Sequence, residues 1–386
     1  MARRANYLDN VWKENTPMLL LDGGDLFGSR SRNEQHQTEF LCQVTGDFGY
    51  DAIGLGEYDL NYGLAFLREM IGKYELPFTS ANVRDTTGTL ILPEYLVVER
   101  GGIRFGIVSV LDPALRIVTL TGEEGAFTVA DPVATLRELL PRLRAQAQTV
   151  VLVGHLGEAT TDAVLREVEG IDLAVIGHTF RNLTRERLID DTIVLGSAYE
   201  GRYVGRANLF LRDSDGKVMA VEVTSTSLDE KVPDDPQMLE RVEAYKVSQV
   251  EFKEAKRAAY PRTYGSKQED FLTDRTCAAC HKDTWEAYLQ TGHARAYTTI
   301  NRQGQAGEPE CLSCHTTGYQ YQNGYADESP FNRLINVQCE ACHGYGTEHA
   351  RDGRWGAQAK DSCVACHDQA NSPNFDYATY WEKIKH

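Results

Sequence analysis

Short apolar runs recur along residues 1–228, and amphipathic stretches separate them. The runs are MLLLD, DAIGLG, YLVVE, RFGIVSV, TVVLVGH, DLAVIGH, TIVLGS and RANLFL, and residues 133–147 between two of them have helical spacing. Apolar runs of this length predict buried strands, and strands that alternate with helices predict a layered domain. We therefore predict an α/β domain over residues 1–230.

The pattern changes after this domain. Residues 234–260 have a proline near their start and no glycine, which predicts a helix, and the turn-rich PRTYGSKQED follows. We predict a helical linker over residues 231–265. Beyond it, residues 266–386 contain only nine Ile, Leu or Val but three of the four Trp and eight Tyr. Such a chain is either disordered or folded around an added apolar group, because its own side chains bury too little surface to offset the entropy of ordering.

The charge balance and the lengths of the apolar runs argue against a nucleic-acid partner and against a membrane-spanning segment. The chain has 40 basic and 56 acidic side chains, a formal charge of −16, which argues against binding to nucleic acid. No run approaches the roughly 18 apolar residues that a membrane-spanning helix needs, so we expect no integral membrane segment. The first residues, MARRANYLDNVWKEN, also lack the apolar region of an export signal.

The sequence CxxCH occurs four times in the C-terminal region, as CAACH, CLSCH, CEACH and CVACH. The residues are Cys277, Cys280 and His281; Cys311, Cys314 and His315; Cys339, Cys342 and His343; and Cys363, Cys366 and His367. Two thiols at this spacing form thioethers to the vinyl groups of a haem, and the adjacent histidine ligates its iron. Zinc is the alternative, but zinc does not require a histidine after every pair. We therefore predict four covalently bound haem c groups.

Three further histidines lie in the same region: His293, His349 and His386. A low-spin electron-transfer haem takes a strong second axial ligand, so we predict that all three bind iron on the side opposite the motif histidine. One of the four irons then has no histidine partner. That iron is five-coordinate, bound by another residue, or completed by a neighbouring copy of the chain in a homo-oligomer.

The C-terminal region resembles the cytochrome c554 family. The matching stretches are WEAYLQTGHARAY, CLSCHTTGY, VQCEACHGYGTEH and SPNFDYATYWEKIKH. The resemblance implies a mostly α-helical, loop-rich tetrahaem domain over residues 266–386, with closely packed haems that exchange electrons with redox partner proteins. It also implies a five-coordinate haem at the second motif. His386 would serve the fourth haem, and His293 and His349 the third and first.

Four side chains of the N-terminal region share one position relative to the predicted strands. Asp25, Glu57, His155 and His178 each follow an apolar run, where loops at the carboxyl edge of a sheet converge. Each residue alone is more simply a polar residue at a strand end, but mixed oxygen and nitrogen ligands suit a divalent metal. We predict one site for a single ion of zinc, manganese or iron.

These stretches resemble the 5'-nucleotidase branch of the calcineurin-like metallophosphoesterases, which includes thiosulfohydrolases. TSANV and TIVLGSAYEGRYVGRANL match as well. The resemblance implies a four-layered α/β/β/α sandwich and two metals that activate water to attack a phosphoryl group. Asp25 would bridge the two metals, and His155 and His178 would be two of the metal ligands.

The chain also departs from that family. GEYDLNYG stands where the family has GNHEFDYG, so Glu57, Tyr58 and Asn61 replace its asparagine ligand, catalytic histidine and aspartate partner. Phe180 replaces the second histidine of the GHxH pair. The first strand of the family, with its AspxHis pair, is missing, and so is an export signal although haem c is attached outside the cytoplasm. We therefore expect that Met1 is a late start and that the full protein is periplasmic or extracellular.

Three functions are compatible with these observations. The first is a multihaem cytochrome that transfers electrons and carries a degenerate metallophosphoesterase-like domain. The second is a metal-dependent hydrolase of phosphoesters, nucleotides or sulfur compounds with haems that couple to redox state. The third is a reductase of small nitrogen oxides at the open haem. Tyr58, Asn61 and Phe180 favour the first function over the second.

Overall fold

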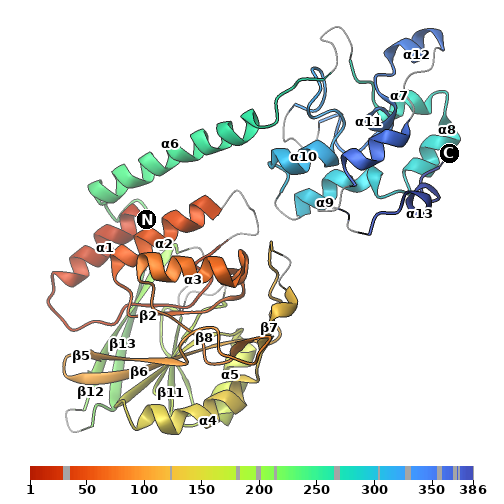
Figure 1. Cartoon of the computed structure of the whole chain (residues 1–386). Helices are drawn as coiled ribbons and strands as arrows, with labels where there is room; N and C mark the ends of the chain where they lie inside the picture. Colours follow the sequence, from red (N-terminus) through yellow and green to blue (C-terminus); the bar gives the residue numbers. More distant parts are fainter. Residues whose placement is uncertain are drawn as a thin grey trace. The chain divides into compact units, whose positions relative to one another are not determined.

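The structure is a computed structural model of the chain that describes residues 1–28, 35–121, 124–179, 183–196, 201–212, 215–264, 270–302, 305–326, 332–353, 359–367, 372 and 374–385. The backbone forms two compact units, Met1–Val247 and Ser248–His386 (Figure 1). The division falls inside the segment for which the sequence predicts a linker. Among the described residues, no helix combines the length and apolar character needed to cross a bilayer. Phe180 and His386 lie outside the described residues.

The N-terminal unit contains helices and strands in mixed order. Its helices are α1 (Ala2–Trp12), α2 (Gln35–Phe48), α3 (Gly63–Tyr74), α4 (Pro132–Arg144) and α5 (Glu158–Glu167), with short 3-10 turns η2 (Glu57–Leu60) and η3 (Glu124–Ala126). Its strands are β1 (Leu21–Asp22), β2 (Ala52–Gly54), β3 (Phe78–Thr79), β4 (Val83–Asp85), β5 (Tyr95–Arg100), β6 (Ile103–Leu111), β7 (Phe127–Val129), β8 (Thr149–His155), β9 (Leu173–Ile176), β10 (Arg187–Ile189), β11 (Thr192–Gly196), β12 (Tyr203–Leu211) and β13 (Val218–Ser227).

The strands form two main sheets. One is parallel with the order β1-β2-β3, and the other has the order β10-β11-β9-β8-β6-β5, in which the four inner strands are parallel. Two antiparallel pairs, β12-β13 and β4-β7, accompany them. The inner strands are the apolar runs of the sequence, and every residue of β8 is buried. Continuous apolar strands of this kind need cover on both faces.

Neighbouring residues of β2 and of β8 belong to different apolar clusters, which shows how the layers stack. Ile53 of β2 packs with helices α2 and α3, whereas Ala52 belongs to a second cluster with Val151 of β8. Leu152 of β8 faces the opposite way, toward α4 and α5. Because neighbouring residues of a strand point to opposite faces, the order is helix, sheet, sheet, helix. This is the predicted four-layered α/β/β/α sandwich, with α2 and α3 on one side and α4 and α5 on the other (Figure 1).

The C-terminal unit is built from short helices. After α6 (Pro236–Ala258), which crosses the division between the units, come α7 (Asp274–Ala278), α8 (Lys282–Tyr288), the 3-10 turn η4 (His293–Arg295), α9 (Ala296–Arg302), α10 (Pro309–His315), α11 (Cys339–His343), α12 (Thr347–Asp352), the 3-10 turn η5 (Ala359–Ala365) and α13 (Tyr377–Trp381). Loops connect them, as the sequence predicts. Among the described residues of this unit, a small cluster of buried apolar side chains packs α9 and α10 against the loops, and it consists of Phe271, Tyr297, Ile300, Leu312, Tyr325 and Leu334.

Candidate functional site

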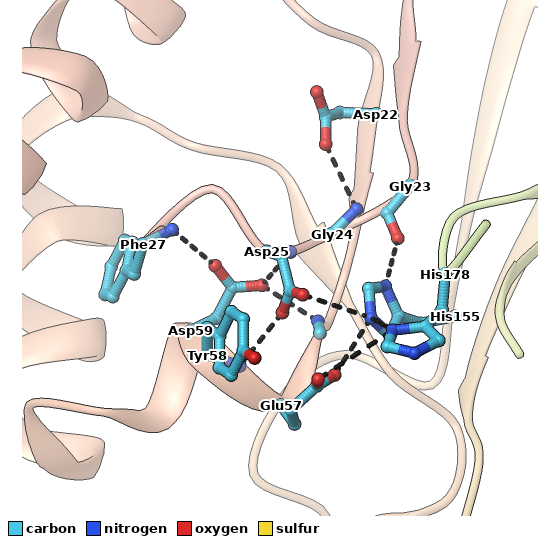
Figure 2. Close-up of polar contacts among 11 residues, drawn as sticks. Asp22, Gly23, Gly24, Asp25, Phe27, Glu57, Tyr58, Asp59, His155 and His178 are labelled. Carbon is cyan, nitrogen blue, oxygen red and sulfur yellow. Dashed lines mark hydrogen bonds and ion pairs between the residues drawn. The ribbon is translucent and has the colours of Figure 1, made fainter. Parts of the chain in front are cut away.

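The four predicted metal ligands of the N-terminal unit converge at one point (Figure 2). Asp25 follows β1, Glu57 begins η2 just after β2, His155 ends β8, and His178 follows β9. One potential ligand atom from each residue lies within 4.8 Å of the others. Residues from both sheets therefore meet at their carboxyl edges, as expected for loops that follow parallel strands.

His155 lies at the centre of this cluster. Its Nε2 is 3.0 Å from Glu57 Oε2, 3.4 Å from Asp25 Oδ2 and 3.3 Å from His178 Nδ1. Its Nδ1 is 2.7 Å from the carbonyl oxygen of Gly23, so in neutral His155 the proton is on Nδ1 and is donated to that carbonyl. The Nε2 lone pair then faces the two carboxylates. Acceptor atoms that face one another in this way are stabilised by a positive charge between them, either a proton or a metal ion.

The electrostatics of His155 and Glu57 agree with that requirement. Burial by itself would lower the pKa of His155, but the carboxylates of Asp25 and Glu57 outweigh it and raise the pKa to about 10. Burial would likewise raise the pKa of Glu57, and the neighbouring His155 lowers it instead. Without a metal, a proton on His155 supplies the missing positive charge. A divalent ion bound by the same four side chains would replace it.

A carboxylate that the sequence analysis missed holds this site together. Asp59 is fully buried and accepts hydrogen bonds from the backbone N–H groups of Asp25 (2.9 Å), Phe27 (2.9 Å) and Gly56 (2.8 Å). Burial, with the charge of Asp25 adding to it, raises the pKa of Asp59 to about 7. The backbone N–H of Tyr58 in turn donates to Asp25 Oδ1 at 2.9 Å. These bonds fix the loop after β1 to the turn η2.

Glycines at the strand ends allow the loops to approach this closely. Gly24 has a φ of +97°, and a Cβ there would lie 2.6 Å from the backbone nitrogen of Gly56. A Cβ on Gly177 would lie 2.1 Å from the carbonyl oxygen of Gly23. A larger residue at either position would separate the two loops. The pattern of an apolar run, glycine and then an acid or histidine is the sequence signal for this geometry.

The four CxxCH motifs lie close together in the C-terminal unit. Helix α11, which carries the third motif, contacts α7 of the first motif and η5 of the fourth. Cys314 of the second motif lies 4.0 Å from the carbonyl oxygen of Ala365. Groups attached at these cysteines would therefore be close neighbours.

Two of the three additional histidines face a motif histidine. The ring centroids of His281 and His349 are 5.9 Å apart, and those of His293 and His367 are 6.1 Å apart. An iron bound by two imidazole nitrogens at about 2 Å each places the ring centroids about 6 Å apart. The residues present therefore fit a haem with two histidine ligands at each pair.

His349 lies beside the histidine of the first motif, to which the resemblance assigned it, and whether either residue binds iron stays a prediction. The resemblance assigned His293 to the third motif, but its ring lies beside His367 of the fourth. His293 lies in η4, and the neighbours of η4 depend on tertiary contacts. The spacing of motifs along the sequence does not show which motif His293 approaches. His386 was expected at the fourth haem and lies outside the described residues.

Two motif histidines are oriented by a hydrogen bond at Nδ1, the ring nitrogen that is not expected to bind iron. Nδ1 of His315 lies 2.8 Å from the carbonyl oxygen of Ala296, and Nδ1 of His367 lies 3.1 Å from the hydroxyl of Ser372. The first contact fixes the tautomer, since a carbonyl only accepts. Nε2 is then left to ligate, which is the usual arrangement around a metal-binding histidine.

Comparisons with known proteins give different relatives for the two units. The family model of cytochrome c554 and c-prime matches residues 276–344. Cytochrome c-554 of Nitrosomonas europaea is 31% identical over 100 residues, which is 22% of this chain and 43% of that protein. The trifunctional nucleotide phosphoesterase YfkN of Bacillus subtilis is 24% identical over 261 residues, which is 56% of this chain and 18% of that protein.

A solved structure shows the fold of the N-terminal part. The sulfate thiohydrolase SoxB of Thermus thermophilus, in complex with glycerol, superposes with a TM-score of 0.57 at 21% identity, and covers 66% of this chain and 47% of that one. The chain therefore spans less than half of the length of each of these three proteins. The N-terminal unit has the metallophosphoesterase α/β fold, and the helical C-terminal unit contains a cytochrome c554 region.

Proposed function

We propose that this chain, which joins a cytochrome c554 region to a metallophosphoesterase-like unit, is a c-type multihaem cytochrome that transfers electrons. One observation supports this most strongly. The unit that carries four CxxCH motifs also holds two imidazole pairs with centroids 5.9 and 6.1 Å apart, the spacing that an iron with two histidine ligands requires.

Haem c supplies one-electron redox chemistry when it is bound. The eight motif cysteines and the four motif histidines would hold the four groups, and His349 and His293 would supply further iron ligands at the first and fourth motifs. His386 remains our proposal for a further axial ligand. Because the motifs are neighbours, we propose that electrons pass from haem to haem and leave to redox partner proteins. Since haem c is attached outside the cytoplasm, we propose a periplasmic or extracellular location.

The intact mass of the protein from its native source tests this proposal. We expect the mass of the polypeptide plus four haems. Zinc in place of covalent haem would refute it. In a matched pair of variants, His349→Ala should convert one haem from low spin to high spin in its electron paramagnetic resonance spectrum. His36→Ala, in the N-terminal unit, should leave all haem signals unchanged.

A second proposal concerns the metallophosphoesterase-like unit. We propose that Asp25, Glu57, His155 and His178 bind one ion of zinc, manganese or iron, because their acceptor atoms converge on one point. Tyr58 and Asn61 stand where the family has catalytic groups, so we propose that the site binds a metal without hydrolysing phosphoesters. Hydrolysis of a phosphoester or sulfur compound is the alternative function of the same site.

Metal analysis and a hydrolase assay separate these two functions. The purified protein should contain about one metal ion per chain, and Asp25→Ala should lose it. We expect no phosphoesterase or thiosulfohydrolase activity above that of Asp25→Ala. Activity that Asp25→Ala abolishes would instead establish the hydrolase. A wild-type protein that binds none of the three metals would refute the metal site itself.

A further inference from the structure

A charge cluster lies beside the second CxxCH motif and has no part in attaching haem. Lys256, near the end of α6, places its ammonium group 2.9 Å from Glu308 Oε2 and 3.4 Å from Glu310 Oε1. The side chain of Glu308 is fully buried, and that of Lys256 is only 26% exposed. This pair lies in a low-dielectric environment, where charges act more strongly on their surroundings than they do at the surface.

The two glutamates belong to the same segment as the motif. The carbonyl of Glu308 accepts hydrogen bonds from the N–H groups of Cys311 (3.0 Å) and Leu312 (2.8 Å), and so begins α10. Helix α10 ends at His315, which makes the whole motif part of this helix. Glu310 is the residue directly before Cys311. Burial raises the pKa of Tyr260, two residues beyond the end of α6, and the charge of Glu310 raises it further.

We propose that Lys256 and Glu308 set the reduction potential of the haem attached at the second motif. This inference rests on the proposed cytochrome function. Reduction of that haem takes one electron from a redox partner and adds one negative charge to the group. The buried carboxylate of Glu308 opposes the added charge, and the ammonium of Lys256 favours it. Helix α6 therefore adjusts one haem of the four, and both side chains are tuning residues that do not ligate iron.

Spectroelectrochemical titration of the holo-protein tests this with four variants. Lys256→Met should lower the potential of one haem, and Glu308→Gln should raise the potential of the same haem. The double variant should return it close to the wild-type value, because both charges are removed together. Lys253→Met removes an exposed lysine from the same helix and should leave every potential unchanged. The four reduction steps are followed separately, so that a shift confined to one step shows that a single haem is affected.

Shifts of opposite sign at one haem distinguish electrostatic tuning from structural damage, which would shift both variants in the same direction. The inference is overturned if neither variant differs from Lys253→Met, or if all haems shift together. If Lys256→Met does not yield holo-protein, Glu308→Gln alone decides, because its amide has nearly the shape of the carboxylate. Absence of covalent haem from the wild-type protein would contradict the cytochrome function itself, which the haem content of each preparation shows separately.

Discussion

At the residue scale, Asp59 controls the metal-ligand cluster without being a member of it. Its carboxylate accepts three backbone N–H groups, from Asp25, Phe27 and Gly56. In Asp59→Asn, an amide NH2 faces at least one of these donors. We expect the free energy of unfolding to fall by about 1–3 kcal/mol, because a buried N–H loses its acceptor. We also expect weaker metal binding, because the loop that carries Asp25 is released.

Chemical denaturation and metal titration measure the two effects. Asp85→Asn is the matched control, because Asp85 also accepts backbone N–H groups, from Thr87 and Thr89, but in an exposed turn. We expect it to change the free energy of unfolding by less than about 1 kcal/mol. Equal stability and equal metal affinity of the two variants would show that Asp59 has no positioning role.

The site residues that could be predicted from the sequence contact other side chains, whereas the one that could not be predicted binds backbone groups. Asp25, Glu57, His155 and His178 were recognisable because each follows an apolar run, and side chains at strand ends meet. Asp59 bonds to backbone atoms of another loop, which no pattern of side chains reveals. The contact between His293 and His367 was also not predictable from spacing, because short loop-connected helices leave many arrangements open.

At the element scale, the turn after β1 determines whether the two loops of the metal site can meet. Gly24→Ala adds a Cβ at 2.6 Å from the backbone nitrogen of Gly56, on a residue with a φ of +97°. We expect a loss of about 1–3 kcal/mol in the free energy of unfolding, because L-residues rarely adopt this conformation. Metal binding should weaken as well, because Asp25 moves with the turn.

Urea unfolding and calorimetric metal titration test this prediction. Gly28→Ala is its control, since Gly28 lies four residues further on and a Cβ there meets nothing within 4 Å. That variant should keep the wild-type stability and metal affinity. A Gly24→Ala protein that behaves like Gly28→Ala would contradict the close approach of the loops.

Helix α6 shows where element prediction ends. Its existence followed from the absence of glycine and the proline near its start, and the helix is observed over Pro236–Ala258. The sequence predicted this segment only as a linker, whereas residues near its end form contacts within the C-terminal unit. Lys256 donates to Glu308 and Glu310, which lie 52 and 54 positions further along the chain, and Arg262 donates to the carbonyl of Tyr325. Contacts of such long range depend on the folded chain and not on local pattern.

At the scale of the whole molecule, the two units obtain their cores differently. The largest cluster of the N-terminal unit contains 18 buried apolar residues, whereas the described part of the C-terminal unit has a cluster of six. This difference follows from composition, since residues 266–386 contain only nine Ile, Leu or Val. The polypeptide alone buries too little apolar surface to offset the entropy of ordering the second unit, so we expect attached haems to complete its core.

This difference predicts that loss of haem unfolds only one unit. In protein produced in a reducing cytoplasm without haem attachment, we expect a protease to cut readily within residues 248–386 and to leave a stable fragment that contains most of residues 1–247. The haem-loaded protein should resist cleavage in both units, because each haem buries apolar surface that the protein side chains do not supply. Mass spectrometry of the fragments locates the cuts, and circular dichroism should show less helix in the haem-free protein. Equal protease resistance of residues 248–386 with and without haem would show that the six-residue cluster is a sufficient core by itself.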